Sequence, residues 1–356
     1  MTGPDYDNFC RLARERSGLV LTPAKAYLVS GRLEPVARAE KLAGVPELLA
    51  RLRSGAPEAL VQRCIDAMAT HESYFFRDGA PFEQLATAVL PALISARQGA
   101  RTLRIWCAAC SSGQEPYSIA MILQEMGARL AGWRIEIIAT DMSEPVLNKA
   151  RSGLYNEFEV KRGLSPERLA RWFKPQGTSW LVSPVLQQMV QFKSHNLLKG
   201  TSGMGVMDVI FCRNVLIYFD VEHKRQILEQ LNRAMAVDGS LFLGSAETVM
   251  GLSQTIEPVT GMRGLYRQGA DHGGVRAGHE HLVGGHPRRG DRGRQWNRTG
   301  AREETHGPLS CAPAPAPPAA ERPDRSSRSG QHLIPAGRDR TGPDQPASGQ
   351  AGADVG

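Results

Sequence analysis

Hydrophobic residues recur along this chain with two different periods, and the change of period divides the sequence. Up to about residue 85, apolar positions recur only at helical spacing, as in FCRLARERSGL and VPELLARLRSG. Gly18, Gly44 and Gly55 are each followed within five residues by a proline, a combination that marks helix ends and starts. The spacing therefore predicts an all-helical N-terminal domain over residues 1–85.

From about residue 86 to residue 268, short β-branched runs alternate with helical patterns. Such alternation favours a mainly parallel sheet covered by helices. We expect strands near residues 103–108, 134–140, 189–193, 207–212, 239–244 and 263–267, the last two forming an antiparallel edge. Between residues 156 and 195 short apolar runs lie between turn residues, which predicts a small antiparallel insertion at about 172–193.

Composition changes beyond residue 268, where Gly, Pro, Arg, Ser and Ala dominate and lysine is absent. Such a segment buries too little apolar surface to offset chain ordering, so residues 269–356 are predicted to form a disordered tail. The chain has 356 residues, 41% of them hydrophobic, and a net charge of +7. No apolar run reaches the roughly 18 residues of a membrane span, and the acidic start is unlike a signal peptide. We therefore expect a cytoplasmic protein without a transmembrane segment.

The most informative stretch is RIWCAACSSGQEPYSIA, residues 104–120, in which a strand pattern meets a turn of small residues and then a helix. This order opens nucleotide-type binding sheets, where a ligand packs against bare backbone at a helix N-terminus. The glycines do not follow GxGxxG, so a nucleoside such as S-adenosylmethionine (SAM) fits better than a dinucleotide. Cys107 and Cys110 form a lone CxxC here, which favours small-residue packing over a disulfide or a metal site.

A second strand pattern, RIEIIATD, ends on Asp141 about one helix later. A carboxylate at the carboxyl end of the second strand can accept the protons of both ribose hydroxyls. The alternative is a capping role for the helix that follows, EPVLNKAR. Together with the small-residue turn, Asp141 favours ribose binding.

Five long motifs give the chain a family resemblance. In order they are THESYFFRD (70–78), WCAACSSGQEPYSIA (106–120), ATDMSEPVLNKARSGLY (139–155), FCRNVLIYFD (211–220) and GSLFLGSAE (239–247). Together they resemble the chemotaxis receptor methyltransferases, the CheR family, over about residues 8–268. The resemblance implies an N-terminal helical domain, then a Rossmann-like SAM-dependent methyltransferase domain. It also implies methyl transfer to glutamate side chains on the cytoplasmic helices of chemoreceptors, by a monomer recruited to membrane-bound receptors.

The resemblance assigns three cofactor-contacting positions at the junction of the two domains. They are His71, Ser73 and Arg77, and the family often has Asn and Thr at the first two. Arg77 can form a fork to the methionyl carboxylate of SAM, whereas its alternative role is a solvated helix cap. Glu115 is expected to bind the cofactor ammonium, or otherwise to complement the dipole of its own helix.

Further positions follow from the remaining motifs. Asn196 and Leu197 match positions that flank the adenine. Asn214 and Val215 match positions beside the transferring methyl. Tyr218 is the catalytic candidate, lining the substrate entrance or polarising the acceptor, and its alternative role is a packed aromatic.

Arg32 and Arg38 lie in a basic segment that resembles the docking region of the family. Receptor helices are acidic around their methylated glutamates, so a basic helix can dock them by charge complementarity. A solvated basic face is the alternative. Some family members grip a receptor C-terminal peptide with a glycine-rich hairpin in the insertion. This chain has only Gly177 there, which argues against such a grip. The alternative role of the insertion is a lid over the cofactor.

Two other functions compete with receptor methylation. The positive net charge permits nucleic-acid contacts, but RNVLIYF replaces the Asn/Asp-Pro-Pro-aromatic motif of amino-methylating nucleic-acid enzymes, so no specific nucleic-acid partner is expected. A non-catalytic SAM-binding signalling protein would keep the cofactor residues without an open acceptor channel. A glutamate acceptor is already ionised at neutral pH, so the favoured reading requires no general base.

Overall fold

The computed structural model describes residues 3–269, so the predicted tail lies outside the described residues except for Gly269. The N-terminal part is all-helical, as predicted. Its helices are α1 (Pro4–Ser17), α2 (Ala26–Ala39), α3 (Val45–Arg53) and α4 (Glu58–Met68), with the short turn η1 (Pro23–Lys25) before α2. Gly18 ends α1 in a left-handed conformation at φ 72°, which glycine adopts without strain. Phe9, Leu33 and Leu48 are fully buried in the core of these helices.

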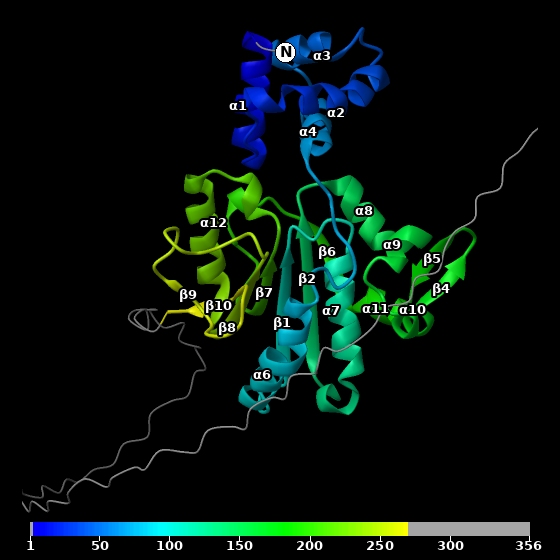
Figure 1. Ribbon diagram of the computed structural model, residues 1–356, viewed down its shortest axis with the longest axis vertical. Helices are drawn as coiled ribbons and strands as arrows, with labels where there is room; N and C mark the ends of the chain where they lie inside the picture. The colour runs from blue at the N-terminus through cyan, green and yellow to red at the C-terminus, as the bar shows by residue number, and fades with distance from the viewer. Residues whose placement is uncertain (1–2, 270–356) are drawn as a thin grey trace, which may run out of the picture. The chain divides into compact units, whose positions relative to one another are not determined.

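The second part is built on a seven-stranded sheet with the order β6-β2-β1-β7-β8-β10-β9 (Figure 1). Its strands are β1 (Thr102–Ala108), β2 (Arg134–Asp141), β6 (Val190–Ser194), β7 (Met207–Cys212), β8 (Met235–Leu243), β9 (Ile256–Pro258) and β10 (Leu265–Gln268). The first five strands in this order are parallel, and β10 is antiparallel to both β8 and β9. The strand order reverses between β1 and β7, where α/β sheets bind their ligands.

All six strands expected in the large sheet are present, and the expected antiparallel edge is confirmed by the pairing of β8 with β10. Two details differ from the prediction. The strand β8 begins at Met235, four residues early, because Met235 pairs with Met207 across a register shift. The short strand β9 was not predicted, because only Ile256 of its three residues is buried.

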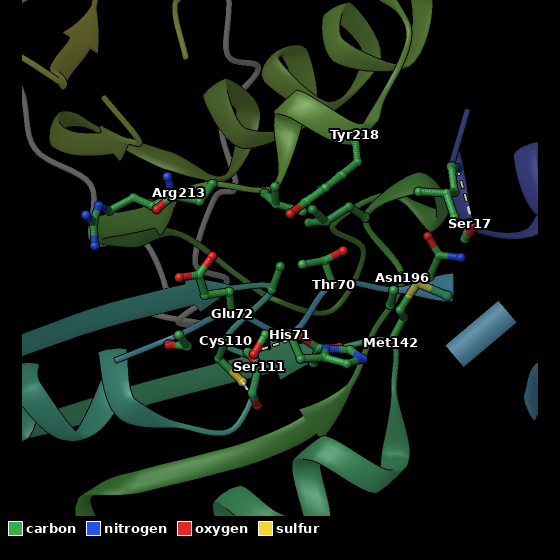
Figure 2. A pocket seen from close by; sticks show the side chains of 18 of the residues that line it. Ser17, Thr70, His71, Glu72, Cys110, Ser111, Met142, Asn196, Arg213 and Tyr218 are labelled. Atoms are coloured by element: carbon green, nitrogen blue, oxygen red, sulfur yellow. Dashed lines mark hydrogen bonds between the residues drawn. The ribbon is translucent and has the colours of Figure 1, made fainter. Parts of the chain in front are cut away.

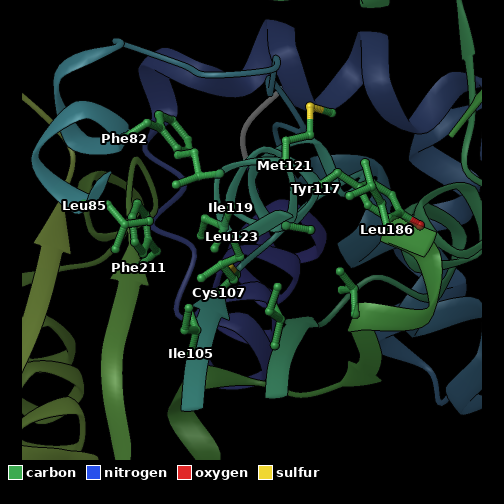
Figure 3. Packing of buried hydrophobic residues seen from close by; sticks show 14 of the residues in the cluster. Phe82, Leu85, Ile105, Cys107, Tyr117, Ile119, Met121, Leu123, Leu186 and Phe211 are labelled. Atoms are coloured by element: carbon green, nitrogen blue, oxygen red, sulfur yellow. The ribbon is translucent and has the colours of Figure 1, made fainter. Parts of the chain in front are cut away.

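Helices cover both faces of the large sheet. They are α5 (Ala80–Gln84), the π-turn η2 (Leu85–Val89), α6 (Leu90–Ala96), α7 (Gln114–Glu125), η3 (Gly127–Leu130), α8 (Glu144–Ser152), α11 (Pro184–Met189) and α12 (Val221–Ala234). Successive residues of β1 face opposite sides, as the pleat requires. Ile105 and Cys107 pack beneath α7 (Figure 3), whereas Trp106 and Ala108 belong to the cluster that includes α12. Burial on both faces explains why the second half of β1, residues 105–108, is continuously apolar.

The small antiparallel sheet predicted in the second part is present, with the order β3-β5-β4. It comprises β3 (Leu154–Asn156), β4 (Phe173–Gln176) and β5 (Ser179–Val182), joined by α9 (Glu157–Lys161) and α10 (Pro166–Trp172). The range 172–193 was imprecise, since β3 lies before it and Val190–Ser194 belongs to the large sheet. Tyr155 explains the position of β3, because its buried ring packs against Phe75 and its hydroxyl donates to the Ser112 carbonyl at 2.6 Å.

An ion-pair cluster joins the end of α6 to the large sheet. It lies near the starts of β7 and β8. Arg97 donates to Asp208 at 2.8 Å and to both carboxylate oxygens of Asp238, at 2.6 and 2.8 Å. The hydrogen bonds with Arg97 lower the pKa of Asp238. Its contribution to stability is therefore present above the ordinary carboxyl pKa and is lost as the pH falls through the lowered pKa.

We expect Asp238→Asn to lower the free energy of unfolding at pH 7 by about 1 kcal/mol or less, since the carboxylate is partly exposed. The difference from the wild type should be constant above the ordinary carboxyl pKa of about 3.9, shrink as the pH falls below that value, and vanish only below the lowered pKa of Asp238. Denaturant unfolding between pH 7 and pH 3 measures it. Glu229→Gln, which removes an exposed ion pair on α12, is the control and should leave the pH dependence unchanged. A difference between Asp238→Asn and the wild type that stays as large at pH 3 as at pH 7 would contradict this assignment.

Candidate active site

The chain leaves β1 through a tightly wound turn. Ala109, Ser111 and Gly113 all have positive φ, at 58°, 51° and 91°. A Cβ on Gly113 would lie 2.9 Å from the Cβ of Ala150, so only glycine fits at this approach of α7 to α8. The small residues allow this tight turn, and Ala109, Cys110 and Ser111 of the turn line a pocket, as the sequence pattern predicts.

A pocket opens beside this turn, with about 1060 Å³ of empty space that includes open solvent at its mouth. Its walls contain every predicted cofactor residue and the catalytic candidate: His71, Ser73, Arg77, Glu115, Asp141, Asn196, Leu197, Asn214, Val215 and Tyr218. In Figure 2, Tyr218 and Arg213 border the pocket on one side, with His71, Cys110 and Ser111 on the other. The topology thus converges the motifs on one cavity at the sheet's switch point.

Both cysteines of the CxxC are almost completely inaccessible, with exposed fractions of 0% for Cys107 and 2% for Cys110. Burial raises the pKa of both thiols well above the ordinary range. Thiols that are hard to ionise are poor nucleophiles and poor metal ligands. Cys110 therefore contributes a small apolar wall to the pocket.

Asp141 stands at the end of β2 with its carboxylate held by backbone groups. One oxygen accepts from the Ser111 N–H at 2.9 Å, and the other accepts from the Ser143 N–H at 3.0 Å. An ionised carboxylate has about four acceptor sites, so these bonds orient it and leave capacity for two hydroxyl protons. This geometry suits ribose recognition. It also joins the turn after β1 to the turn after β2.

We expect Asp141→Ala to raise the dissociation constant of S-adenosylhomocysteine (SAH) about 10- to 100-fold, because hydrogen bonds to a charged group are lost. Isothermal titration calorimetry on the purified chain measures this change. Glu144→Gln removes an exposed carboxylate three residues away and is the matched control. Unchanged SAH affinity in Asp141→Ala would contradict the ribose assignment.

A buried ion-pair cluster lies at the next wall of the pocket and involves a residue that the sequence did not single out. The side chain of Arg213 is 1% exposed. It reaches Glu115 at 3.0 Å, Asp78 at 2.7 Å and the Arg77 carbonyl at 2.8 Å. Burial raises the pKa of Glu115 and Arg213 opposes that rise. A ligand ammonium beside Glu115 would further favour its ionised form.

Arg77 lines the pocket with an incompletely satisfied guanidinium. Its Nη1 donates to the Glu72 carbonyl at 2.6 Å. Its Nε is buried and has no hydrogen-bond partner among the described residues. The remaining N–H groups of this guanidinium form the planar arrangement of donors that suits the carboxylate of a ligand.

Asn196 has a second role that its motif did not indicate. Its Oδ1 accepts from the Leu198 N–H at 2.9 Å and so caps the turn η4 (Leu197–Lys199). Its Nδ2 donates to the Arg16 carbonyl at 2.6 Å, at the end of α1. The amide therefore holds a pocket wall together, and Leu197 is 7% exposed beside it.

The turn after β7 is fixed by Glu247, which is 8% exposed. One oxygen of Glu247 accepts from the backbone N–H groups of Val215 and Leu216, at 2.8 and 2.7 Å. The other accepts from Asn214 at 2.8 Å and from Gly244 at 2.6 Å. Asn214 has φ 58°, a conformation that asparagine tolerates better than most residues. One buried carboxylate thus stabilises the turn that carries Asn214 and Val215.

Tyr218 ends the short turn η5 (Leu216–Tyr218) and lines the pocket. Its carbonyl accepts from the Val20 N–H at 3.4 Å. A Cβ on Gly18 would lie 2.4 Å from the Phe219 ring, so the end of α1 packs closely on this turn. The N-terminal helices therefore complete the pocket wall, to which Ser17 and Leu19 also contribute.

Neither predicted docking arginine lines the pocket. Arg38 is exposed on α2 and pairs with Glu34 at 3.2 Å. Arg32 donates to the carbonyls of Met68 and Ala69, at 2.5 and 3.1 Å, and to the Thr70 hydroxyl at 3.0 Å. The guanidinium of Arg32 is therefore engaged within the chain, which its sequence context did not reveal.

The donor set of the pocket fits SAM group by group. Asp141 offers acceptors for ribose, Glu115 a counter-charge for an ammonium, and Arg77 a guanidinium for a carboxylate. The small-residue turn allows an adenosyl group to approach the backbone. Fold and site together define a SAM-dependent methyltransferase.

Comparisons with known proteins give the family. Two protein-family models match the chain. The family described as CheR methyltransferase, SAM binding domain, matches residues 71–264, and the family described as CheR methyltransferase, all-alpha domain, matches residues 4–69. Chemotaxis protein methyltransferase Cher2 of Pseudomonas putida is 38% identical over 268 residues, which cover 74% of this chain and 97% of that protein. Chemotaxis protein methyltransferase 1 of Pseudomonas aeruginosa is 42% identical over 254 residues, covering 70% and 91%. The chain belongs to the CheR family of SAM-dependent chemotaxis methyltransferases.

Proposed function

We propose that this chain methylates glutamate side chains on the cytoplasmic helices of chemoreceptors and produces glutamate methyl esters and SAH. The observation that carries the proposal is the joining of two groups of residues in one pocket. Asp141 and Glu115 suit the cofactor, and the turn from Asn214 to Tyr218 faces the same cavity. Within residues 3–269, no helix combines the length and hydropathy needed to cross a membrane. As the family resemblance implies, the chain acts in this proposal as a cytoplasmic monomer that meets its receptors at the membrane.

When bound, SAM supplies an electrophilic methyl group on a sulfonium. The acceptor glutamate is ionised near neutral pH, because its ordinary pKa is about 4.3, so no side chain has to remove a proton. The task of the protein is then to align the carboxylate oxygen with the methyl and to exclude water. Arg77, Glu115 and Asp141 hold the cofactor ends, while Tyr218 orients the acceptor with its hydroxyl.

Docking of the receptor is assigned to Arg38, an exposed arginine in the last turn of α2. The Arg38 side chain is 77% exposed and has only its helical neighbour Glu34 as a partner among the described residues. An acidic receptor helix can displace that weak surface pair.

Radiolabelled methyl transfer to receptor-enriched membranes tests the proposal. We expect incorporation into receptor protein and release of the label as methanol under mild alkali, because carboxyl methyl esters are base-labile. A base-stable mark on RNA or DNA would indicate a nucleic-acid methyltransferase. SAM binding without transfer to any receptor preparation would indicate a non-catalytic signalling protein. Either result would overturn the proposal.

A further inference from the structure

Arg32 joins α2 to the segment that leads from α4 into the cofactor pocket. Its Nη1 lies 2.5 Å from the Met68 carbonyl and 3.1 Å from the Ala69 carbonyl. Its Nη2 donates to the Thr70 hydroxyl at 3.0 Å. Ala69 and Thr70 themselves line the pocket. One guanidinium thus contacts three consecutive residues at the pocket edge.

Helix chemistry explains why an arginine suits this place. The last carbonyls of an α-helix have no partner within the helix and carry partial negative charge. Helix α4 ends at Met68, and Ala69 is already extended at φ −67° and ψ 145°. A planar guanidinium offers five donors in a fixed arrangement, which a flexible ammonium cannot reproduce. Arg32 therefore fixes where the chain departs from α4.

The segment that follows α4 carries two proposed cofactor residues within three positions of Thr70, the last residue that Arg32 contacts. His71 and Ser73 line the pocket. The His71 carbonyl accepts from the Ser111 hydroxyl at 3.5 Å, which links the segment to the turn after β1. A shift of residues 68–70 would consequently move these side chains relative to Asp141.

We infer that Arg32 is a positioning residue for cofactor binding, acting through residues 68–70, rather than a receptor-docking residue. Docking then falls to Arg38, which lies six residues further along α2 and is exposed. The inference deepens the proposed function, and its receptor part rests on that function. Its cofactor part does not, because it is measurable without a receptor.

The test is SAH binding to the full chain by calorimetry with no receptor present. We expect Arg32→Met to raise the dissociation constant about 10-fold, since hydrogen bonds from a charged donor are lost. Arg32→Lys, which keeps the charge but not the fork, should recover part of the affinity. In steady-state assays the KM for SAM should rise in Arg32→Met while kcat changes less than 3-fold, as expected for lost cofactor binding.

Two matched controls separate this role from loss of charge and from loosened helix packing. Arg38→Met removes the exposed charge on the same helix. Arg63→Met removes a 2.7 Å ion pair with Glu40 that also joins α4 to the end of α2. Both should bind SAH within about 2-fold of the wild type, whereas Arg38→Met should weaken receptor binding.

Wild-type SAH affinity in Arg32→Met, with weakened receptor binding, would overturn the inference and restore Arg32 as a docking residue. Equal loss of SAH affinity in Arg63→Met would also overturn it, because a general packing defect would then explain the effect. If Arg32→Met does not fold, Arg32→Lys decides the question, and wild-type SAH affinity in that variant would refute the inference. The wild-type chain could fail to methylate receptors while Arg32→Met still binds SAH more weakly than the wild type. That combination would refute only the proposed function.

Discussion

Arg213→Met is expected to lower the free energy of unfolding by about 3 to 5 kcal/mol and to reduce methyl transfer at least 100-fold. Removing one partner of a buried ion pair leaves uncompensated charge, which costs far more than a surface pair. Here two carboxylates, Glu115 and Asp78, lose their cation at 3.0 and 2.7 Å. Arg77 also loses the bond to its carbonyl. Glu115 and Arg77, the two proposed cofactor residues that Arg213 contacts, should become misaligned as a result.

Denaturant unfolding and SAH calorimetry measure the two effects of Arg213→Met separately. Arg213→Lys serves as the conservative variant and should retain most of the stability but bind SAH more weakly, because one ammonium cannot hold both carboxylates and the Arg77 carbonyl. The double variant Arg213→Met with Glu115→Gln should regain stability without regaining SAH affinity. An Arg213→Met protein with wild-type stability and SAH affinity would rule out this role.

The fold was largely predictable because the central strands β1, β2 and β7 are buried over most of their length. The apolar residues around Trp106 and the β-branched run that ends at Asp141 identify β1 and β2. The strands β3 and β9 have three residues each, too short to show a period. Tyr155 anchors β3 through contacts with residues distant in sequence, Phe75 and Ser112, and such contacts leave no local pattern.

Most site residues were predicted from the family resemblance, and the convergence of the motifs that follow the strands has a topological reason. Carboxyl ends of parallel strands meet at one edge of a sheet, so motifs that follow β1, β2 and β7 must come together there. The partners of those motifs were not predictable. Arg213 pairs with Glu115 across 98 residues, and Glu247 binds Val215 across 32. Arg32 likewise shows no local sign that its guanidinium faces the end of α4 rather than solvent.

Glu247→Gln is expected to reduce kcat about 100-fold while raising the dissociation constant of SAH less than 10-fold. The carboxylate accepts four backbone N–H groups, at 2.6 to 2.8 Å, from the two loops that follow β7 and β8. A glutamine keeps one acceptor oxygen and replaces the other with an NH₂ group. That NH₂ group would face two backbone N–H groups, so two of the four hydrogen bonds are replaced by repulsion between donors. The turn carrying Asn214 should then shift, and misplacement by about 1 Å at a reacting centre costs on the order of 100-fold in rate.

Steady-state kinetics with varied SAM and receptor, together with SAH calorimetry, distinguish the two effects of Glu247→Gln. Glu257→Gln on β9 is the control, since it neutralises an exposed carboxylate of the same domain outside the pocket. Glu247→Asp should recover part of kcat, because it keeps both acceptor oxygens on a shorter stem. Equal losses of kcat and SAH affinity in Glu247→Gln would mean that the carboxylate supports the whole pocket. A selective loss of kcat would assign Glu247 to the placement of Asn214 and Tyr218 at the reacting methyl.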